Sequence, residues 1–308
     1  MVKYIINRFI ASIFTLLVLV TLVFLLIRLL PGDPFTSEKM TPEVRKNMMN
    51  YYGLDKPLHI QYFRYLGNLA RGDLGTSMKY ANRRINDIIA QAFPYSADLG
   101  IRSILLAVAV GLVLGVAAAT RRGKSWDYVC MVIAIIGVSI PDFIGAYLLQ
   151  FVFGIKLHLL PVAQWKSFRH TILPVFALSL YTLALIARIM RSSMLEVVSQ
   201  DYVKTAKSKG LSPLEVVLKH QIRNAILPVV TLLGPITASV LTGTFVVELI
   251  FAIPGMGKWY VLGIQNLDYS MILGMTVFYG VFLIFANFIV DILYGFIDPR
   301  IRMVREGR

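Results

Sequence analysis

The sequence is poor in charged residues and almost free of cysteine. Asp, Glu, Lys and Arg make up 16% of its 308 residues, whereas a soluble domain usually carries about a quarter. Hydrophobic residues reach 57%, which excludes a disordered or collagen-like chain and leaves too few polar side chains to cover a water-facing surface. Cys130 is the single cysteine, so no disulfide framework can form within the chain.

Short motifs typical of enzymes are also missing. None of the four histidines begins an H-E-x-x-H zinc site, and neither an S-x-x-K nor a G-x-S-x-G nucleophile motif occurs. Gly123-Lys124-Ser125 has the end of a phosphate loop, but Ala118 stands at its first glycine and an apolar run rather than a strand precedes it. We therefore expect no catalytic residue, no metal, no cofactor and no ATP hydrolysis by this chain.

Long apolar segments are what the sequence does contain. A helix needs about 20 apolar residues to cross a bilayer. The first such segment ends in Pro31-Gly32-Asp33-Pro34 without a cleavage site, so we interpret it as a retained helix rather than a signal peptide. The sequence thus predicts an all-α integral membrane protein with six transmembrane helices, at about 9–30, 97–119, 128–154, 171–190, 226–251 and 271–296.

The lysines and arginines predict the orientation of these helices. With a cytoplasmic N-terminus, 16 of them fall inside and 4 in the short outer loops, once the long segment 31–96 is set aside. We predict that both termini are cytoplasmic. The net charge of +14 then reflects membrane topology, and we expect membrane lipid rather than nucleic acid as a partner.

The predicted spans divide the chain into an N-terminal helix (1–30), an extracytoplasmic segment (31–96), a membrane core (97–298) and a cytoplasmic tail (299–308). Within 31–96, Thr41-Pro42 and Gly53 mark the ends of one short helix. Apolar residues recur at helical spacing within 57–71 and again from Ile85 to Phe93. These patterns favour a small helical cap on the outer membrane face over a loosely packed loop.

The segment 191–225 is predicted to lie outside the membrane on the cytoplasmic side. Residues 201–210 are typical of a short helix ended by Gly210, and Ser212-Pro213-Leu214-Glu215 is a capping box that starts another helix, extending to about 224. The alternative interpretation is an amphipathic connector on the lipid headgroups, which its lysines would also suit.

A few polar residues fall inside the predicted spans, where they are functional candidates because their burial in lipid is unfavourable. Pro141 should kink the third span, and Asp142 beside it either faces an aqueous pathway or is a buried acid tied to another helix. Asp98 and Arg102 are spaced for an ion pair along one helix. Glu248, near the end of the fifth span, is a candidate for the pathway or for helix packing.

Short motifs are distributed along the whole chain, at 31–34, 52–58, 72–75, 137–141, 187–194, 202–211, 226–228, 252–257 and 297–300. In this order they resemble the motifs of type-1 ABC importer permeases, and specifically those of the B-type permease of bacterial oligopeptide and dipeptide importers. The resemblance implies a permease core over 97–298 in the bacterial cytoplasmic membrane.

The cytoplasmic segment matches the EAA loop of that family only in part. Lys204 stands at the glutamate position and Thr205 at the first alanine, whereas Ala206 and Gly210 match. The resemblance implies a loop that couples the permease to an ATPase, with the residues Lys204, Thr205, Ala206, Gly210, Leu211, Pro213 and Val217.

The partners implied by the resemblance are a homologous second permease, two cytoplasmic ATP-binding subunits, an extracytoplasmic peptide-binding protein and a peptide substrate. Phe35-Thr36 and residues 77–80 look more like oligopeptide than dipeptide members. Dipeptide, glutathione and nickel import stay open as alternatives. A self-contained secondary transporter is the competing class, although no inverted repeat is evident in the sequence.

Overall fold

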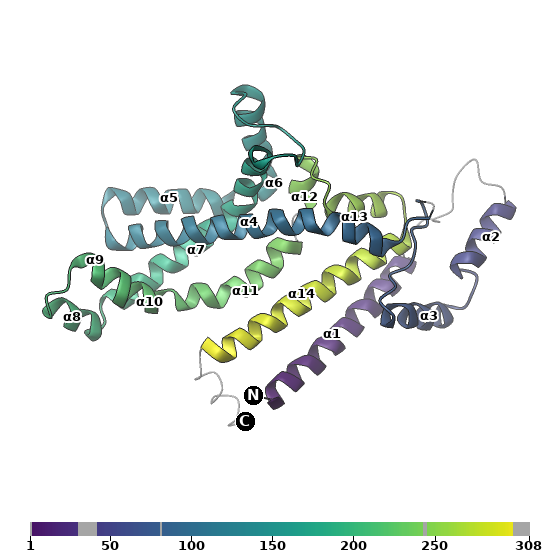
Figure 1. Ribbon diagram of the computed structural model, residues 1–308, viewed down its shortest axis with the longest axis horizontal. Helices are drawn as coiled ribbons and strands as arrows, with labels where there is room; N and C mark the ends of the chain where they lie inside the picture. The colour runs from purple at the N-terminus through teal and green to yellow at the C-terminus, as the bar shows by residue number, and fades with distance from the viewer. Residues whose placement is uncertain (1, 30–41, 81, 243–244, 298–308) are drawn as a thin grey trace. The chain divides into compact units, whose positions relative to one another are not determined.

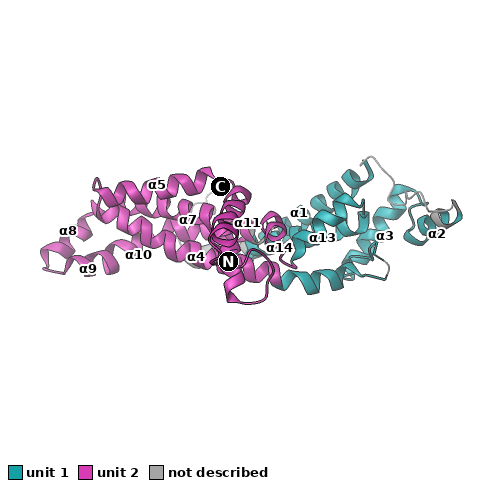
Figure 2. Cartoon of the chain, turned by 90° about the horizontal axis from the view of Figure 1, so that it is seen from above, with its two compact units in different colours: residues 1–94, 255–308 teal, residues 95–254 magenta. Residues whose placement is uncertain are grey.

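A computed structural model describes residues 2–29, 42–80, 82–242 and 245–297, and nearly all of them are helical (Figure 1). They form two compact units, one drawn from residues 1–94 and 255–308 and the other from residues 95–254 (Figure 2). The all-α prediction is confirmed for this part of the chain. The predicted tail 299–308 and the motifs at 31–34 and 35–36 lie outside the described residues.

The first unit is built on the first and last helices of the chain. α1 (Val2–Leu29) lies antiparallel to α14 (Tyr269–Ile297), and the ring centroids of Phe9 and Phe288 are 6.4 Å apart (Figure 1). α13 (Met256–Gln265) packs on α14, where Gly263 leaves room for the side chain of Met271.

Two short helices of the 31–96 segment form as predicted. α2 (Pro42–Tyr52) is followed by Gly53, whose φ of +69° strains any residue with a Cβ, and α3 (Leu58–Ala70) comes next. The Tyr62 hydroxyl lies 2.6 Å from that of Thr21 on α1. Phe24 on α1 packs against the rings of Tyr62 and Tyr65. α3 is therefore packed against α1, not part of a loose loop.

One buried carboxylate ties the segment between α3 and α4 to the start of α14. Asp268 is fully buried and accepts hydrogen bonds from the Ser77 hydroxyl and from the backbone N–H groups of Met78 and Lys79, at 3.1 and 3.3 Å. It also accepts the N–H of Met271 at 3.1 Å, which caps the first turn of α14.

The helical spacing of Ile85–Phe93 is confirmed, and these residues begin α4 (Ile85–Thr120), which continues without interruption through the predicted second span, 97–119. Pro94 lies inside α4 without ending it. A proline removes one backbone hydrogen bond from a helix. The complete burial of Ile85 and Ile88 in the first unit offsets this loss, because it stabilises the helical turns that precede Pro94. Further along α4, the predicted ion pair of Asp98 and Arg102 is confirmed at 2.7 Å.

α7 (Phe168–Val198) is the central helix of the second unit, where about half of its residues are buried. α5 (Ser125–Ser139), α6 (Asp142–Leu149) and α11 (Leu227–Thr242) pack against it. Glycines on α4 and α5 permit direct backbone contact with α7. A Cβ added to Gly111, Gly115 or Gly137 would lie within 3 Å of Ile186, Met190 or Ala184, respectively.

Within the described residues, four helices are long and apolar enough to cross a membrane: α1, α4, α7 and α14. Two bent pairs raise the number to six if each pair is one span. The predicted third span, 128–154, is such a pair: α5 and α6 meet at 107°, and α6 continues into the π-helical segment η1 (Gln150–Lys156). The predicted span 226–251 comprises α11 and the short helix α12 (Phe245–Ile250).

The glycine contacts lead to a stability prediction. We expect Gly115→Ala to destabilise the protein by about 1–3 kcal/mol, the usual range for overpacking, because its Cβ would lie 2.7 Å from the Ala187 carbonyl oxygen. Gly67→Ala on α3 is the matched control, since a Cβ there meets nothing within 4 Å. This control should gain about 0.5–1 kcal/mol from helix propensity. Thermal unfolding of detergent-purified protein measures both, and equal melting temperatures would contradict the packing argument.

Candidate functional site

The hairpin at residues 201–225 follows α7 directly and lies at the end of the second unit (Figure 1). Its first arm is α8 (Asp201–Ser208), and its second arm consists of α9 (Pro213–Glu215), η2 (Val216–Gln221) and α10 (Ile222–Ala225). Val203, Ala206 and Val216 are buried between the arms, and Leu211 packs against them. The predicted pair of helices is confirmed, and Ala206 and Leu211 hold the two arms together.

Gly210 makes the turn between the arms. Its φ is +77°, as expected for a glycine that ends a helix, and its N–H donates to the carbonyl oxygen of Lys207 at 3.0 Å. The predicted capping box is confirmed two residues later. The Ser212 hydroxyl accepts the Glu215 N–H at 3.3 Å, and the Glu215 carboxylate accepts the Ser212 N–H at 3.4 Å and lies 3.1 Å from the Lys219 ammonium.

The outer surface of the hairpin combines apolar and basic side chains. Tyr202, Leu214 and Leu218 are exposed to 41%, 67% and 54%, which is unusual for large apolar residues on a segment with many lysines. Exposed apolar side chains grouped in this way are typical of a surface that a partner covers. Four of the predicted coupling residues are exposed on the hairpin as well: Lys204, Thr205, Gly210 and Pro213.

The second arm is not the uniform α-helix that the sequence predicts. Residues Val216–Gln221 are π-helical, and the next helix, α11, turns away from the arm by 51°. Val217 is partly buried against a cluster that includes Met190 and Met194 of α7. π-helical turns are frequent at functional sites, and this one joins the hairpin to the membrane helices. Val217 therefore anchors the arm to α7.

An ion pair fixes the end of α7 from which the hairpin starts. Arg191 donates two hydrogen bonds to Asp127, at 2.6 and 2.8 Å, and the Asp127 side chain is only 6% exposed. Asp127 also accepts the N–H of Gly123 at 3.0 Å. This carboxylate thus joins the turn between α4 and α5 to α7, and a bidentate pair fixes orientation as well as distance.

The second candidate region surrounds Asp142, the first residue of α6. Pro141 lies at the break after α5, and its carbonyl oxygen accepts the N–H groups of Ile144 and Gly145 at 2.9 and 3.0 Å. The predicted kink at Pro141 is a break in the helix. The chain turns through 107° there, and Pro141, which has no N–H, precedes the first residue of the new helix α6.

Asp142 borders a cavity of about 130 Å³ in the second unit. The cavity is also lined by Leu178, Tyr181 and Thr182 of α7 and by Ile236, Ser239 and Val240 of α11. Glu248, the third pathway candidate, is not among the described lining residues and is fully buried in α12 beside Val247 and Phe251. The structure thus places Asp142 at a cavity and Glu248 among buried residues of α12.

The sequence analysis missed Asp127 and Arg191 as partners. The residues lie 64 positions apart, so no local spacing rule relates them. The sequence did contain a signal for a paired carboxylate at Asp127. This acid stands three residues after Lys124, the last residue of the basic turn 121–124, and it precedes a long apolar run. An acid at such a boundary indicates a buried or paired carboxylate.

Two family profiles match the chain. A profile described as "Binding-protein-dependent transport system inner membrane component" matches residues 111–303. Another, described as "Binding-prot-dependent transport system membrane comp, N-term", matches residues 1–99. The two matches cover both ends of the chain and include the hairpin and Asp142.

Curated relatives are similar along their entire length. The dipeptide transport system permease protein DppB of Bacillus subtilis (strain 168) is 50% identical over 308 residues, all of both chains. The oligopeptide transport system permease protein OppB of Escherichia coli (strain K12) is 44% identical over 305 residues, 98% of this chain and 100% of the relative.

Among solved structures, the inward-facing MetNI methionine ABC transporter is similar with a TM-score of 0.57 at 15% identity. The match covers 67% of this chain and 94% of that chain. At this identity the similarity concerns the fold alone.

The Asp127–Arg191 pair predicts a difference between two arginines on one helix. Arg191→Ala would leave a buried carboxylate without its partner, and we expect a loss of about 3 kcal/mol, the lower end for a buried pair because Arg191 is 26% exposed. Arg188→Ala removes the same charge from an exposed position on α7 and should change stability by less than about 0.5 kcal/mol. Thermal unfolding compares them, and a harmless Arg191→Ala would contradict the role of the pair.

Proposed function

Because this chain belongs to the family of binding-protein-dependent transport system inner membrane components, we propose that it is the permease subunit of an ATP-driven peptide importer. It is a multi-pass protein of the inner membrane. The observation that carries the proposal is the end-to-end similarity to peptide permeases, which leaves no part of the chain unmatched by its 50% identical relative. In this function the chain carries out no catalysis, and ATP is hydrolysed on partner subunits.

Six membrane spans follow if the α5–α6 pair counts as one and the segment 226–251, formed by α11 and α12, as another. The hairpin at 201–225 then lies in the cytoplasm, where its exposed Tyr202, Leu214 and Leu218 receive an ATP-binding subunit. A homologous second permease completes the pathway, and its own loop receives the second ATPase. An extracytoplasmic binding protein delivers peptide to the side that carries residues 42–80.

Coupling follows from how rigidly the hairpin is attached. Ala206 and Leu211 join its arms, Val217 anchors it to α7, and the Asp127–Arg191 pair fixes the end of α7. Movement of the ATPases would thus be passed to the membrane helices. ATP binding supplies the differential affinity that shifts the permease between inward and outward states.

Oligopeptides are our first choice of substrate, on the similarity of residues 77–80 to oligopeptide members. Dipeptides are the alternative substrate. The overall identity favours them, since the chain is 50% identical to a dipeptide permease and 44% identical to the Escherichia coli oligopeptide permease. Reconstitution in proteoliposomes tests the function. The chain, purified with its second permease, ATPases and binding protein, should take up radiolabelled peptide only with ATP inside. Uptake driven by an ion gradient without ATP would identify a secondary transporter instead.

The orientation is tested by thiol labelling in a Cys130→Ala background. Gly67 and Ser208 are exposed, and a side chain at Gly67 meets nothing within 4 Å. In intact cells, an impermeant maleimide should label Gly67→Cys but not Ser208→Cys, which should react only after lysis. Labelling of Ser208→Cys in intact cells would reverse the orientation and exclude the hairpin as the ATPase contact.

The turn at Gly210 should be required for coupling. Gly210→Val would force a β-branched residue to φ near +77°, at a cost of about 1–2 kcal/mol or more in backbone strain. We expect the variant to insert and assemble but to transport less peptide per ATP hydrolysed. Gly210→Asn, which tolerates this φ better, should retain most of the coupling. Normal uptake by Gly210→Val would remove the turn from the mechanism.

Asp142 should influence which peptides pass. If its carboxylate faces the pathway, Asp142→Asn should leave assembly and ATPase activity intact and reduce uptake of lysine-containing peptides by up to about tenfold relative to neutral ones, the equivalent of about 1.4 kcal/mol. Asp98→Asn, which removes an acid paired with Arg102 on α4, is the control and should not discriminate between peptides. An equal loss for all peptides would indicate a structural role for Asp142.

A further inference from the structure

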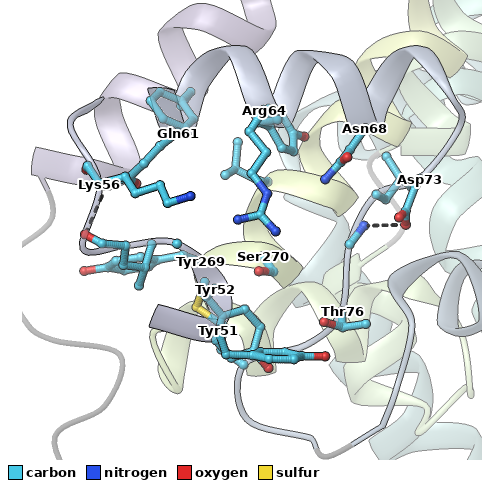
Figure 3. Close-up of a pocket in the computed structure, with 18 of the residues that line it drawn as sticks. Tyr51, Tyr52, Lys56, Gln61, Arg64, Asn68, Asp73, Thr76, Tyr269 and Ser270 are labelled. Carbon is cyan, nitrogen blue, oxygen red and sulfur yellow. Dashed lines mark hydrogen bonds between the residues drawn. The ribbon is translucent and has the colours of Figure 1, made fainter. Parts of the chain in front are cut away.

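A cationic pocket in the first unit is not used by the proposed transport function. It has a volume of about 320 Å³ and lies between α3, the loop after α2, the segment 73–78 and the adjoining ends of α1 and α14 (Figure 3). Three basic residues line it: Arg28, Lys56 and Arg64. Figure 3 shows Lys56 and Arg64 extending into the same space.

Among the described residues, the basic side chains of the pocket have no acidic partner. Asp73 is the one acid in the lining, and its carboxylate already accepts the Gly75 N–H at 3.0 Å and lies 3.7 Å from Arg84, which is outside the lining. In the described part of the chain, no carboxylate lies within ion-pair distance of Arg28, Lys56 or Arg64. Like charges directed into one space repel each other unless an anion lies between them.

Several polar atoms in the pocket are buried without a hydrogen-bond partner among the described residues: Arg28 Nε, Tyr65 Oη and Gln61 Oε1. Leaving such groups unpaired is unfavourable, so they indicate a missing ligand. Burial raises the pKa of the Tyr65 hydroxyl, which keeps it a hydrogen-bond donor. The residues that carry these unpaired atoms, Arg28, Gln61 and Tyr65, all line the pocket.

Aromatic rings hold the Arg28 guanidinium in place. It lies over the rings of Phe24 and Tyr269, 5.1 and 5.6 Å from their centroids. A Cβ on Gly53 would lie 2.8 Å from Arg64 Nη1, so the glycine leaves the room that this exposed guanidinium occupies. Planar guanidinium groups suit a phosphate group.

The position of the pocket favours a lipid over a soluble anion. Arg28 is in the last turn of α1, and Tyr269 is in the first turn of α14, two helices that are apolar and long enough to span a bilayer. Basic and tyrosine side chains at the ends of spans lie at the level of the headgroups. Leu25, one turn deeper on the same face of α1 as Arg28, is 47% exposed, and Leu22, deeper still, is 54% exposed. Such a surface suits acyl chains below a bound headgroup.

We propose that this pocket binds the phosphate of an anionic phospholipid headgroup, with Arg28, Lys56 and Arg64 as its ligands. The acyl chains lie along the exposed leucines on the membrane side of Arg28. The lipid then joins α3 to α1 and α14 and stabilises the first unit. This role is independent of which peptide is carried.

The test measures lipid binding to the full chain purified in its native assembly. Lipid-exchanged nanodiscs of phosphatidylcholine are compared with nanodiscs containing phosphatidylglycerol, and native mass spectrometry counts retained lipid. Phosphatidylglycerol should raise the melting temperature of the wild type. The double variant Lys56→Gln/Arg64→Gln should bind it about tenfold or more weakly, as expected when charge-assisted hydrogen bonds are lost. Arg71→Gln, an exposed basic residue at the end of α3 outside the lining, should behave as the wild type.

Four results would overturn the proposal. Equal retention of phosphatidylglycerol by the double variant would locate the lipid elsewhere. Equal stabilisation by inorganic phosphate at matched concentration, without retained lipid, would identify a site for soluble anions. If Arg71→Gln bound lipid as weakly as the double variant, the effect would be a general one of surface charge. Arg28→Lys keeps the charge but removes Nε, and its lipid retention should fall between wild type and double variant; unchanged retention would also count against the assignment.

Discussion

The second unit depends on how closely its helices approach α7. Lipid tails are as apolar as leucine side chains, so helices in a membrane gain little from hydrophobic burial and associate largely through van der Waals contact. Gly111, Gly115 and Gly137 permit that contact, because each brings a helix backbone to within reach of α7 side chains and carbonyl groups. The remaining features of the unit, the broken span at Pro141 and the hairpin beyond residue 200, are positioned relative to this packed centre.

Polar contacts at helix ends complete what the apolar packing begins. Asp268 in the first unit and Asp127 in the second are both buried carboxylates that accept backbone N–H groups. Asp268 also accepts the Ser77 hydroxyl, and Asp127 also accepts two N–H groups of Arg191. Gln150 works similarly, since its amide donates to the carbonyl oxygens of Val162 and Ile250. In each case one side chain satisfies groups from two distant segments, and a buried polar group is favourable only when its partners are complete.

Features set by neighbouring residues could be predicted from the sequence, whereas features set by distant residues could not. The turns at Gly53 and Gly210 and the capping box at Ser212 depend on local backbone geometry, and the structure has each of them. Whether the Ile85–Phe93 stripe forms its own helix depends on what packs against it, and the break at Pro141 depends on the helices that surround α6. The Asp127–Arg191 pair and the lining of the Asp142 cavity arise only when α5, α6, α7 and α11 are assembled.

The pairing of α1 with α14 has a consequence for synthesis. The two helices are separated by about 240 residues, so at about 5–20 residues per second the ribosome completes the second one on the order of 10–50 s after the first. The second unit comes from one continuous stretch, residues 95–254, and all its contacts are available before α14 exists. Many chains fold from the N-terminus onward, but here the middle can be finished first. Until α14 is synthesised, the face of α1 that packs on it is exposed to lipid. A membrane insertase or a quality-control protease can bind α1 during this time.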